Sequence, residues 1–348
     1  MMVPCGESGY REFMETRVRD FLTESVMKGQ MISFDGARIQ YYYAVQAKAR
    51  ASIVLVHGFT EFFGKFHEAF YNFFDQGYNV FFIEQRGHGL SQRFVDNREL
   101  IHIDSFDTYT RDLKCFLDEI VVPNSVASAE TDASGIASAS DDVHLSTRKL
   151  PLLLYCHSMG GCVGALFLED YPVYFKAALL SSPMLKINFG GMKNWQTDLL
   201  AKTSKILGWE KRPLPNYTPF DPVHPDFENS STLSRARFDY SFEQRLLGGD
   251  CYTMSGGTYG WCIAAMDAAR KIRENAHTVR IPVLICQAGR DDMVDNEGQN
   301  VFARHAANCR IRRFPEAKHE IYNSTGNMLR DYEDTVLNFY AEVLENLR

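Results

Sequence analysis

The sequence predicts an α/β protein with a mostly parallel central sheet, helices on both faces and a mainly helical cap inserted between two strands. Three observations support this class. Short apolar runs of strand length alternate with segments of helical spacing along most of the chain. A serine stands in a tight turn between one such run and the helix after it. The alternation stops between Met184 and Ala276 and then resumes, which indicates an inserted unit.

The first elements precede the parallel strands. Tyr10–Val26 carries apolar residues at helical spacing and predicts an N-terminal helix. Met31–Phe34 and Arg38–Val45 flank Asp35-Gly36, and an Asp-Gly pair between two strand-like runs is a strong hairpin signal. We therefore expect a β-hairpin here.

The later strands are short and apolar, as strands buried on both faces of a parallel sheet require. The candidates are Ser52–Val56, Asn79–Glu84, Pro151–Tyr155, Lys176–Ser181, Ile281–Gln287 and Cys309–Phe314. Helical patterns separate or follow them, at Lys65–Gln76, Ile103–Val121, Cys162–Tyr171, Asp295–Ala307 and Asn327–Leu347.

The domain organisation follows from where this alternation fails. Residues 185–276 contain helical stretches, all three tryptophans and several proline or glycine breaks. We interpret them as a cap over the carboxyl ends of the strands, with residues 1–184 and 277–348 as the core. Within the core, residues 124–149 are rich in Ser, Ala and Asp and predict a flexible insertion. A regulatory or docking loop is the alternative.

Composition indicates which binding partners and which cellular compartment to expect. The net charge is 37 − 44 = −7 and no stretch is strongly basic, which argues against nucleic acid as a partner. The eight cysteines form no C-x-x-C pair, which is typical of reduced thiols in a cytoplasmic protein. Residues 1–9 lack the pattern of a secretory signal. No apolar run approaches the roughly 18 residues of a membrane-spanning helix, and peripheral membrane contact through the cap is compatible with this sequence.

The serine in the tight turn is Ser158. It lies in Cys156-His157-Ser158-Met159-Gly160-Gly161, after a predicted strand and before a predicted helix. Strand, sharp turn and helix are the context of a nucleophile elbow, in which a turn lifts the serine hydroxyl clear of the sheet. The usual pattern is G-x-S-x-G, and Cys156 occupies the first glycine position. We therefore expect a slightly more crowded elbow.

A nucleophilic serine needs a base, and the base needs an orienting acid. On this architecture they follow the serine in the order acid, then histidine. His319 comes five residues after the strand that ends at Phe314 and precedes the last helix. Asp291 and Asp292 both follow the preceding strand, and spacing alone does not separate them. Asp295 is better placed to cap the next helix.

The negatively charged oxygen of an acyl-transfer intermediate needs two backbone N–H donors. The residue after the nucleophile, Met159, supplies the first candidate. The turn His57-Gly58-Phe59-Thr60 follows a predicted strand and supplies the second, the N–H of Phe59.

These motifs resemble those of the serine α/β-hydrolases, and within them the branch of monoglyceride lipases and bacterial lysophospholipases. The similar segments cover roughly Gln30 to the C-terminus except residues 124–149. They are His57-Gly58-Phe59-Thr60-Glu61 with Gly64-Lys65-Phe66, Arg86-Gly87-His88-Gly89-Leu90-Ser91, His157-Ser158-Met159-Gly160-Gly161, Gly289-Arg290-Asp291-Asp292-Met293-Val294-Asp295 and Glu316-Ala317-Lys318-His319-Glu320.

The resemblance resolves the acid, since Asp291 takes the catalytic position in the G-x-x-D-x-x-V-D pattern. It implies a triad of Ser158, Asp291 and His319 and no metal or organic cofactor. Two departures are Cys156 for glycine and Glu84 for the usual aspartate before the R-G-H-G loop.

The resemblance also implies the reaction, hydrolysis of a carboxylic ester in a small lipid or related substrate. A lysophospholipid ranks first and a monoacylglycerol second. A general esterase, a thioesterase or an acyltransferase follows, and peptide hydrolysis is a further alternative on this fold. A binding protein of the same fold without catalysis is the hypothesis of another class. The oligomeric state is not determined by the sequence.

Overall fold

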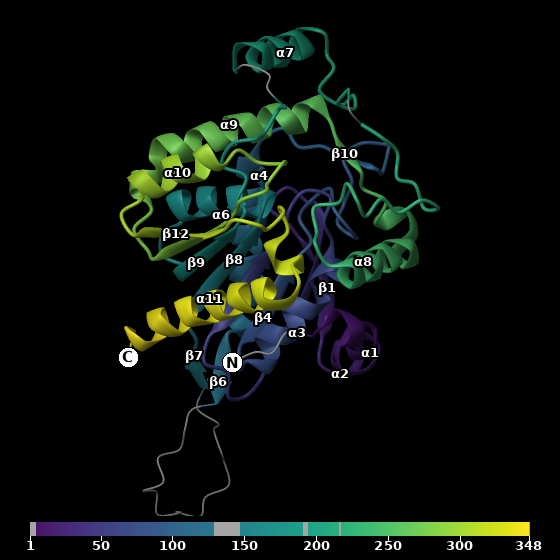
Figure 1. The fold of residues 1–348 in the computed structure, drawn as a ribbon. Coiled ribbons are helices and arrows are strands. Elements are labelled where there is room, and N and C mark those ends of the chain that lie inside the picture. The colour runs from purple at the N-terminus through teal and green to yellow at the C-terminus, as the bar shows by residue number, and fades with distance from the viewer. Residues whose placement is uncertain (1–4, 129–146, 191–193, 216, 348) are drawn as a thin grey trace, which may run out of the picture.

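The computed structural model describes residues 5–128, 147–190, 194–215 and 217–347 (Figure 1). Its centre is an eight-stranded sheet in the order β1-β2-β4-β3-β8-β9-β11-β12. β1 pairs antiparallel with β2, β2 pairs antiparallel with β4, and the remaining neighbours are parallel. The predicted α/β class and the hairpin around Asp35-Gly36 are confirmed. The strands are β1 Met27–Ile32, β2 Arg38–Ala44, β3 Ser52–Val56, β4 Asn79–Ile83, β8 Leu152–His157, β9 Phe175–Ser181, β11 Val283–Ala288 and β12 Cys309–Phe314.

Helices cover both faces of this sheet, as Figure 1 shows. The core on one face includes α4 (Phe106–Phe116), α6 (Met159–Asp170), α9 (Tyr259–Asn275) and α10 (Asn296–His305). The core on the other face includes α2 (Arg19–Glu24), α3 (His67–Asp75) and α11 (Gly326–Glu345). The short helices α1 (Tyr10–Phe13) and α5 (Val122–Asn124) complete these layers. No helix in the described ranges is long and apolar enough to cross a bilayer.

Burial along the strands explains why the sequence predicted them well. Every residue of β3, β4 and β8 is buried, because helices cover these central strands on both faces. The edge strand β12 is only partly buried. Its three arginines are exposed, whereas Cys309, Ile311 and Phe314 are partly or fully buried. The observed strands begin and end within two residues of the predicted ones, except that β1 begins at Met27, four residues before the predicted Met31, because its first residues already pair with β2.

The helix α9 lies in the range 185–276 that we expected to form the cap. It packs on α6 and α10 as part of the helical layer over the sheet. Its buried face carries Ala264, Ala265, Ala268 and Ala269, and such small side chains let the helix lie close to its neighbours. We therefore propose that the cap proper is 185–258 and that α9 belongs to the core.

The cap contains the helices α7 (Asn194–Ile206) and α8 (Arg235–Gly248), and the short strand β10 (Gly256–Gly257) pairs with β5 (Leu100–Ile101) of the core. The position of α8 is set by a buried ion pair: Arg237 of α8 lies 2.7 Å from Glu68 of α3. Removal of either partner alone would leave an uncompensated buried charge, so the pair fixes how α8 lies on the core.

The insertion predicted at residues 124–149 is ordered at both ends. Val126–Ser128 (β6) and Thr147–Lys149 (β7) pair as antiparallel strands, and Ala127 is buried against Ala49 and Leu150. The prediction of flexibility is therefore wrong for these two ends, because even a three-residue strand can be held by pairing and one buried alanine. Residues 129–146 lie outside the described residues.

Candidate active site

Ser158 lies in a sharp turn between β8, which ends at His157, and α6, which begins at Met159. Its backbone has φ +51° and ψ −118°, a left-handed conformation that is strained for a residue other than glycine. The turn brings α6 so close to β3 that a Cβ on Gly160 would overlap the carbonyl oxygen of Val56. The small residues after the serine are therefore a steric requirement of this turn.

Cys156 fits the elbow without displacing it. Its side chain is fully buried and points to Gly164 of α6, where a Cβ would overlap the sulfur. The extra volume of a cysteine at the usual glycine position is thus accommodated by a second glycine one turn later on the facing helix. Burial also raises the pKa of Cys156 well above its ordinary value, so the thiol stays neutral.

The structure brings the three predicted triad residues together. Nε2 of His319 lies 2.8 Å from Oγ of Ser158, and Nδ1 lies 2.7 Å from Oδ2 of Asp291. The three residues follow β8, β11 and β12, whose carboxyl ends meet at one edge of the parallel sheet. Since the Asp291 carboxylate can only accept, Nδ1 carries the proton and Nε2 is free to accept one from the serine.

The structure also separates the two candidate acids. The Asp291 side chain is fully buried against His319, and its Oδ1 accepts the backbone N–H groups of Met293 and Val294. Asp292 is exposed. Asp295 caps α10 as expected, by accepting the N–H of Glu297 at 2.9 Å.

The turn after β3 holds the Phe59 N–H in a defined direction. Nε2 of His57 accepts the N–H of Gln85 at 2.9 Å, so its ring proton is on Nδ1, which lies 2.8 Å from the Gly58 carbonyl oxygen. Burial lowers the pKa of His57 to about 4 and keeps this ring neutral. Because C=O and N–H of a trans peptide point in opposite directions, the Phe59 N–H points away from His57. Among the described residues, neither this N–H nor that of Met159 has a hydrogen-bond acceptor.

The sequence analysis assigned no role to Glu61, although this residue lies in one of the similar segments. Its buried carboxylate accepts the Gly58 N–H at 2.5 Å, the Tyr322 hydroxyl at 2.7 Å and Nδ1 of His157 at 3.0 Å. Lys65 adds an ion pair at 3.2 Å. One carboxylate thus joins the turn after β3, the elbow and the loop that follows His319.

His157 extends this network to the triad. Its Nε2 lies 3.4 Å from the His319 carbonyl oxygen and its Nδ1 faces Glu61, so both ring nitrogens face acceptors. Burial alone would lower the pKa of His157, but the charge and hydrogen bond of Glu61 outweigh it and the pKa is raised. A protonated His157 satisfies both acceptors.

The longer acid Glu84 is accommodated by a glycine of the R-G-H-G loop. Glu84 is buried, and its two oxygens accept the N–H groups of Phe63 at 3.0 Å and Leu90 at 2.7 Å. Gly89 has φ +52°, and a Cβ there would overlap the carboxyl group. Burial, partly offset by these hydrogen bonds, raises the pKa of Glu84 to about 7. The loop has a structural role in this arrangement.

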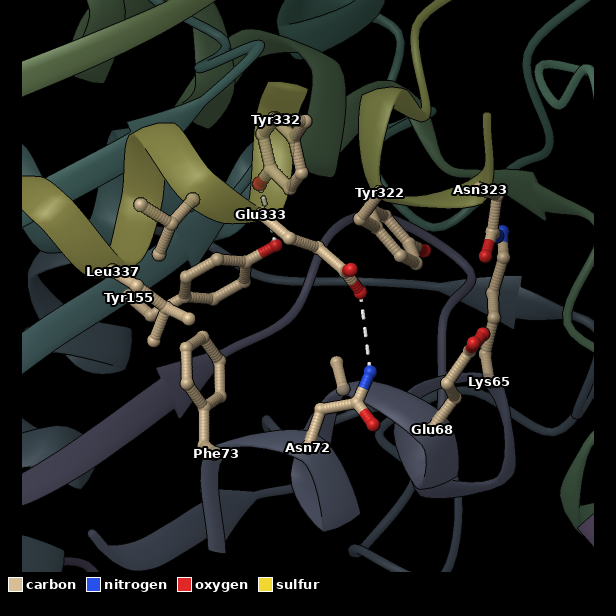
Figure 2. A pocket seen from close by; sticks show the side chains of 12 residues that line it. Lys65, Glu68, Asn72, Phe73, Tyr155, Tyr322, Asn323, Tyr332, Glu333 and Leu337 are labelled. Atoms are coloured by element: carbon tan, nitrogen blue, oxygen red, sulfur yellow. Dashed lines mark hydrogen bonds between the residues drawn. The ribbon is translucent and has the colours of Figure 1, made fainter. Parts of the chain in front are cut away.

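Two cavities lie near the site. Figure 2 shows a small one of about 30 Å³ between α3 and α11, in which Asn72 donates to Glu333 at 3.1 Å and the hydroxyls of Tyr155 and Tyr332 lie 2.7 Å apart. No triad residue lines it, and it is too small for a lipid. A larger cavity of about 170 Å³ lies under α8 beside the turn after β3. Among the described residues, no cluster of His, Cys, Asp and Glu could hold a metal ion.

Comparison with known proteins identifies the family of this chain. The profile of the serine aminopeptidase S33 family of hydrolases matches residues 47–326. The chain belongs to this family. A probable lysophospholipase L2 of Haemophilus influenzae is 24% identical over 304 residues, which cover 87% of this chain and 88% of the relative. Lysophospholipase L2 of Escherichia coli is 26% identical, over 72% of this chain and 66% of the relative. A monoacylglycerol lipase of Mycolicibacterium smegmatis is 21% identical, over 83% of this chain and 88% of the relative.

Solved structures agree on the fold of this family member. A soluble variant of monoglyceride lipase from Saccharomyces cerevisiae superposes with a TM-score of 0.66 at 20% identity, over 93% of this chain and 96% of that one. A carboxyl esterase from Bacillus coagulans superposes with a TM-score of 0.68 at 16% identity, over 92% of this chain and 99% of that one. The chain is a serine hydrolase with the α/β-hydrolase fold, and the resemblance inferred from its motifs is confirmed.

Proposed function

We propose that the chain is a carboxylic ester hydrolase that releases the fatty acid of a lysophospholipid through an acyl-enzyme on Ser158. The observation that carries this proposal is the hydrogen-bonded row Ser158–His319–Asp291 at the carboxyl ends of three parallel strands. A serine, a base and a buried acid in this order are the parts that acyl transfer needs.

In the acylation step, Oγ of Ser158 attacks the ester carbonyl carbon while Nε2 of His319 accepts the hydroxyl proton. Asp291 holds Nδ1 protonated and stabilises the imidazolium that forms. The N–H groups of Phe59 and Met159 are positioned to stabilise the oxyanion, a contribution of roughly 100- to 1,000-fold in rate for one donor.

The intermediate collapses when His319 gives its proton to the leaving oxygen, which departs as the glycerophospho group. In deacylation, His319 takes a proton from water, and the resulting hydroxide attacks the acyl carbonyl. The second oxyanion collapses with return of the proton to Ser158, which frees the fatty acid and restores the enzyme.

The names of similar proteins support the lipid substrate. Two of the relatives are named lysophospholipase L2, one of them as probable, which favours a lysophospholipid. Monoacylglycerol hydrolysis is the second candidate, favoured by the similarity to the Mycolicibacterium enzyme. The aminopeptidase name of the family keeps peptide hydrolysis as an outcome that the experiment must test.

The test begins with a fluorophosphonate probe, which should label the wild-type protein and Ser25→Ala but not Ser158→Ala. Rates are then measured on lysophosphatidylcholine, on a monoacylglycerol and on an ester and an anilide of the same short acyl group. We expect Ser158→Ala to fold normally and to lose nearly all turnover. Retained activity in Ser158→Ala would remove the mechanism, and faster cleavage of the anilide would make the protein a peptidase.

A further inference from the structure

The 170 Å³ cavity adjoins two loops of the proposed active site, although no triad residue lines it. Its lining includes Thr60, which follows the oxyanion candidate Phe59, and Glu320, which follows His319. Because His319 protonates the leaving oxygen in the proposed mechanism, the group that departs must start beside this histidine. This cavity adjoins both the turn that carries Phe59 and the loop that carries His319, so we place the head group there.

Arg245 of α8 contributes a fixed positive charge to this cavity. Its Nε donates to the Tyr252 carbonyl oxygen at 3.1 Å, and its Nη2 donates to the Met254 carbonyl oxygen. These two hydrogen bonds hold the guanidinium in place. In the described part of the chain, no carboxylate forms an ion pair with Arg245, and its Nη1 has no hydrogen-bond partner. Burial lowers the pKa of Arg245 to about 10, partly offset by the charges of Glu320 and Glu99.

The second cation of the cavity is already neutralised. Nζ of Lys65 lies 2.6 Å from Glu320 and 3.2 Å from Glu61. The lining residues Lys65, Arg245 and Glu320 sum to one positive charge, and beyond the lining the charge of Glu61 is matched by a protonated His157. That excess is located at Arg245, where a neutral glycerol head group would leave it unpaired and a phosphodiester, with one negative charge, would balance it.

We propose that Arg245 binds the phosphodiester of a lysophospholipid head group in this cavity and so selects lysophospholipids over monoacylglycerols. The proposal rests on the hydrolase function proposed above and assigns it a specificity-determining residue. Phe62, Phe238 and Phe242 line the same cavity and offer aromatic faces to the ammonium end of a phosphocholine.

The first experiment compares Arg245→Gln with Arg98→Gln. Arg98 is an exposed arginine that also donates to a backbone carbonyl of this region, that of Asp250, but does not line the cavity. The ratio of kcat/KM for lysophosphatidylcholine to that for a monoacylglycerol of the same chain should fall roughly 10- to 100-fold in Arg245→Gln, the usual effect of losing a charged hydrogen bond, and stay unchanged in Arg98→Gln. A folding defect would lower both rates together and leave the ratio intact, so an unchanged ratio in folded Arg245→Gln overturns the proposal.

The second experiment needs no variant. Glycerophosphocholine, the product that carries the phosphodiester, should inhibit p-nitrophenyl butyrate hydrolysis by the wild-type protein at a far lower concentration than glycerol does. Equal inhibition by the two would refute the role of Arg245. If hydrolysis and probe labelling of Ser158 persist in that case, the esterase function stands and only the head-group assignment fails; absence of both would remove the function itself.

Discussion

Asp291→Asn tests the proposed triad most directly, because the hydrogen bonds of Asp291 dictate how an amide would lie. Oδ1 accepts the N–H groups of Met293 at 3.0 Å and Val294 at 3.1 Å. Only the oxygen of an asparagine amide can take that place, since its nitrogen is a donor. The NH₂ group of the new residue would therefore face Nδ1 of His319.

This arrangement would change the tautomer of His319. An NH₂ group that donates to Nδ1 requires that nitrogen to accept, so the ring proton would move to Nε2, which faces Ser158 Oγ at 2.8 Å. Nε2 could then no longer accept the serine proton. A substitution of this kind in a serine protease lowers turnover by about 10⁴-fold, which corresponds to about 5.4 kcal/mol of lost transition-state stabilisation.

The assay is kcat for p-nitrophenyl butyrate and for lysophosphatidylcholine, with the melting temperature as a check on folding. Asp292→Asn is the matched control: it makes the same chemical change at the neighbouring, exposed position and should leave kcat within about twofold. Equal losses in the two variants, or a loss of less than about tenfold in Asp291→Asn, would refute the assignment of the acid.

Two further predictions concern stability. Gly160→Ala should destabilise the fold by about 1–3 kcal/mol or more, because its Cβ would overlap the Val56 carbonyl oxygen, whereas Gly6→Ala, with nothing within 4 Å, should be neutral in thermal unfolding. Burial raises the pKa of Glu333 from 4.5 to about 8, so the folded state holds this proton more tightly than the unfolded chain and loses stability as pH rises through that interval. The free energy of unfolding of Glu333→Gln should therefore equal that of the wild type at about pH 4 and exceed it at about pH 9. If urea unfolding shows the same pH dependence of this free energy in both proteins, Glu333 is not the cause.

The core elements could be predicted because local patterns are sufficient for them. A strand covered on both faces must be apolar throughout, so β3, β4 and β8 were visible as short runs. The elbow was equally visible, since the approach of α6 to the end of β3 requires a glycine at position 160. Chain order then placed an acid and a histidine after later strands of the same sheet.

The structure changed the limits of the inserted units, for reasons that lie beyond local pattern. The alanine-rich face of α9 is compatible with a cap or a core layer, and only its contacts with α6 and α10 distinguish them. In the same way, β6 and β7 are ordered through their mutual pairing and the burial of Ala127, which the composition of residues 124–149 did not indicate.

The sequence by itself determined the fold class and the candidates for the nucleophile and the base, because these depend on periodicity and on residue types within single elements. Spacing alone did not separate Asp291 from Asp292; the motif resemblance pointed to Asp291, and the tertiary structure turns its carboxylate toward His319. It also showed that Glu61 joins three loops and that, among the described residues, no carboxylate forms a direct ion pair with Arg245. Burial, hydrogen-bond partners and charge compensation are set by segments far apart in the chain, so they are fixed only when those segments pack together.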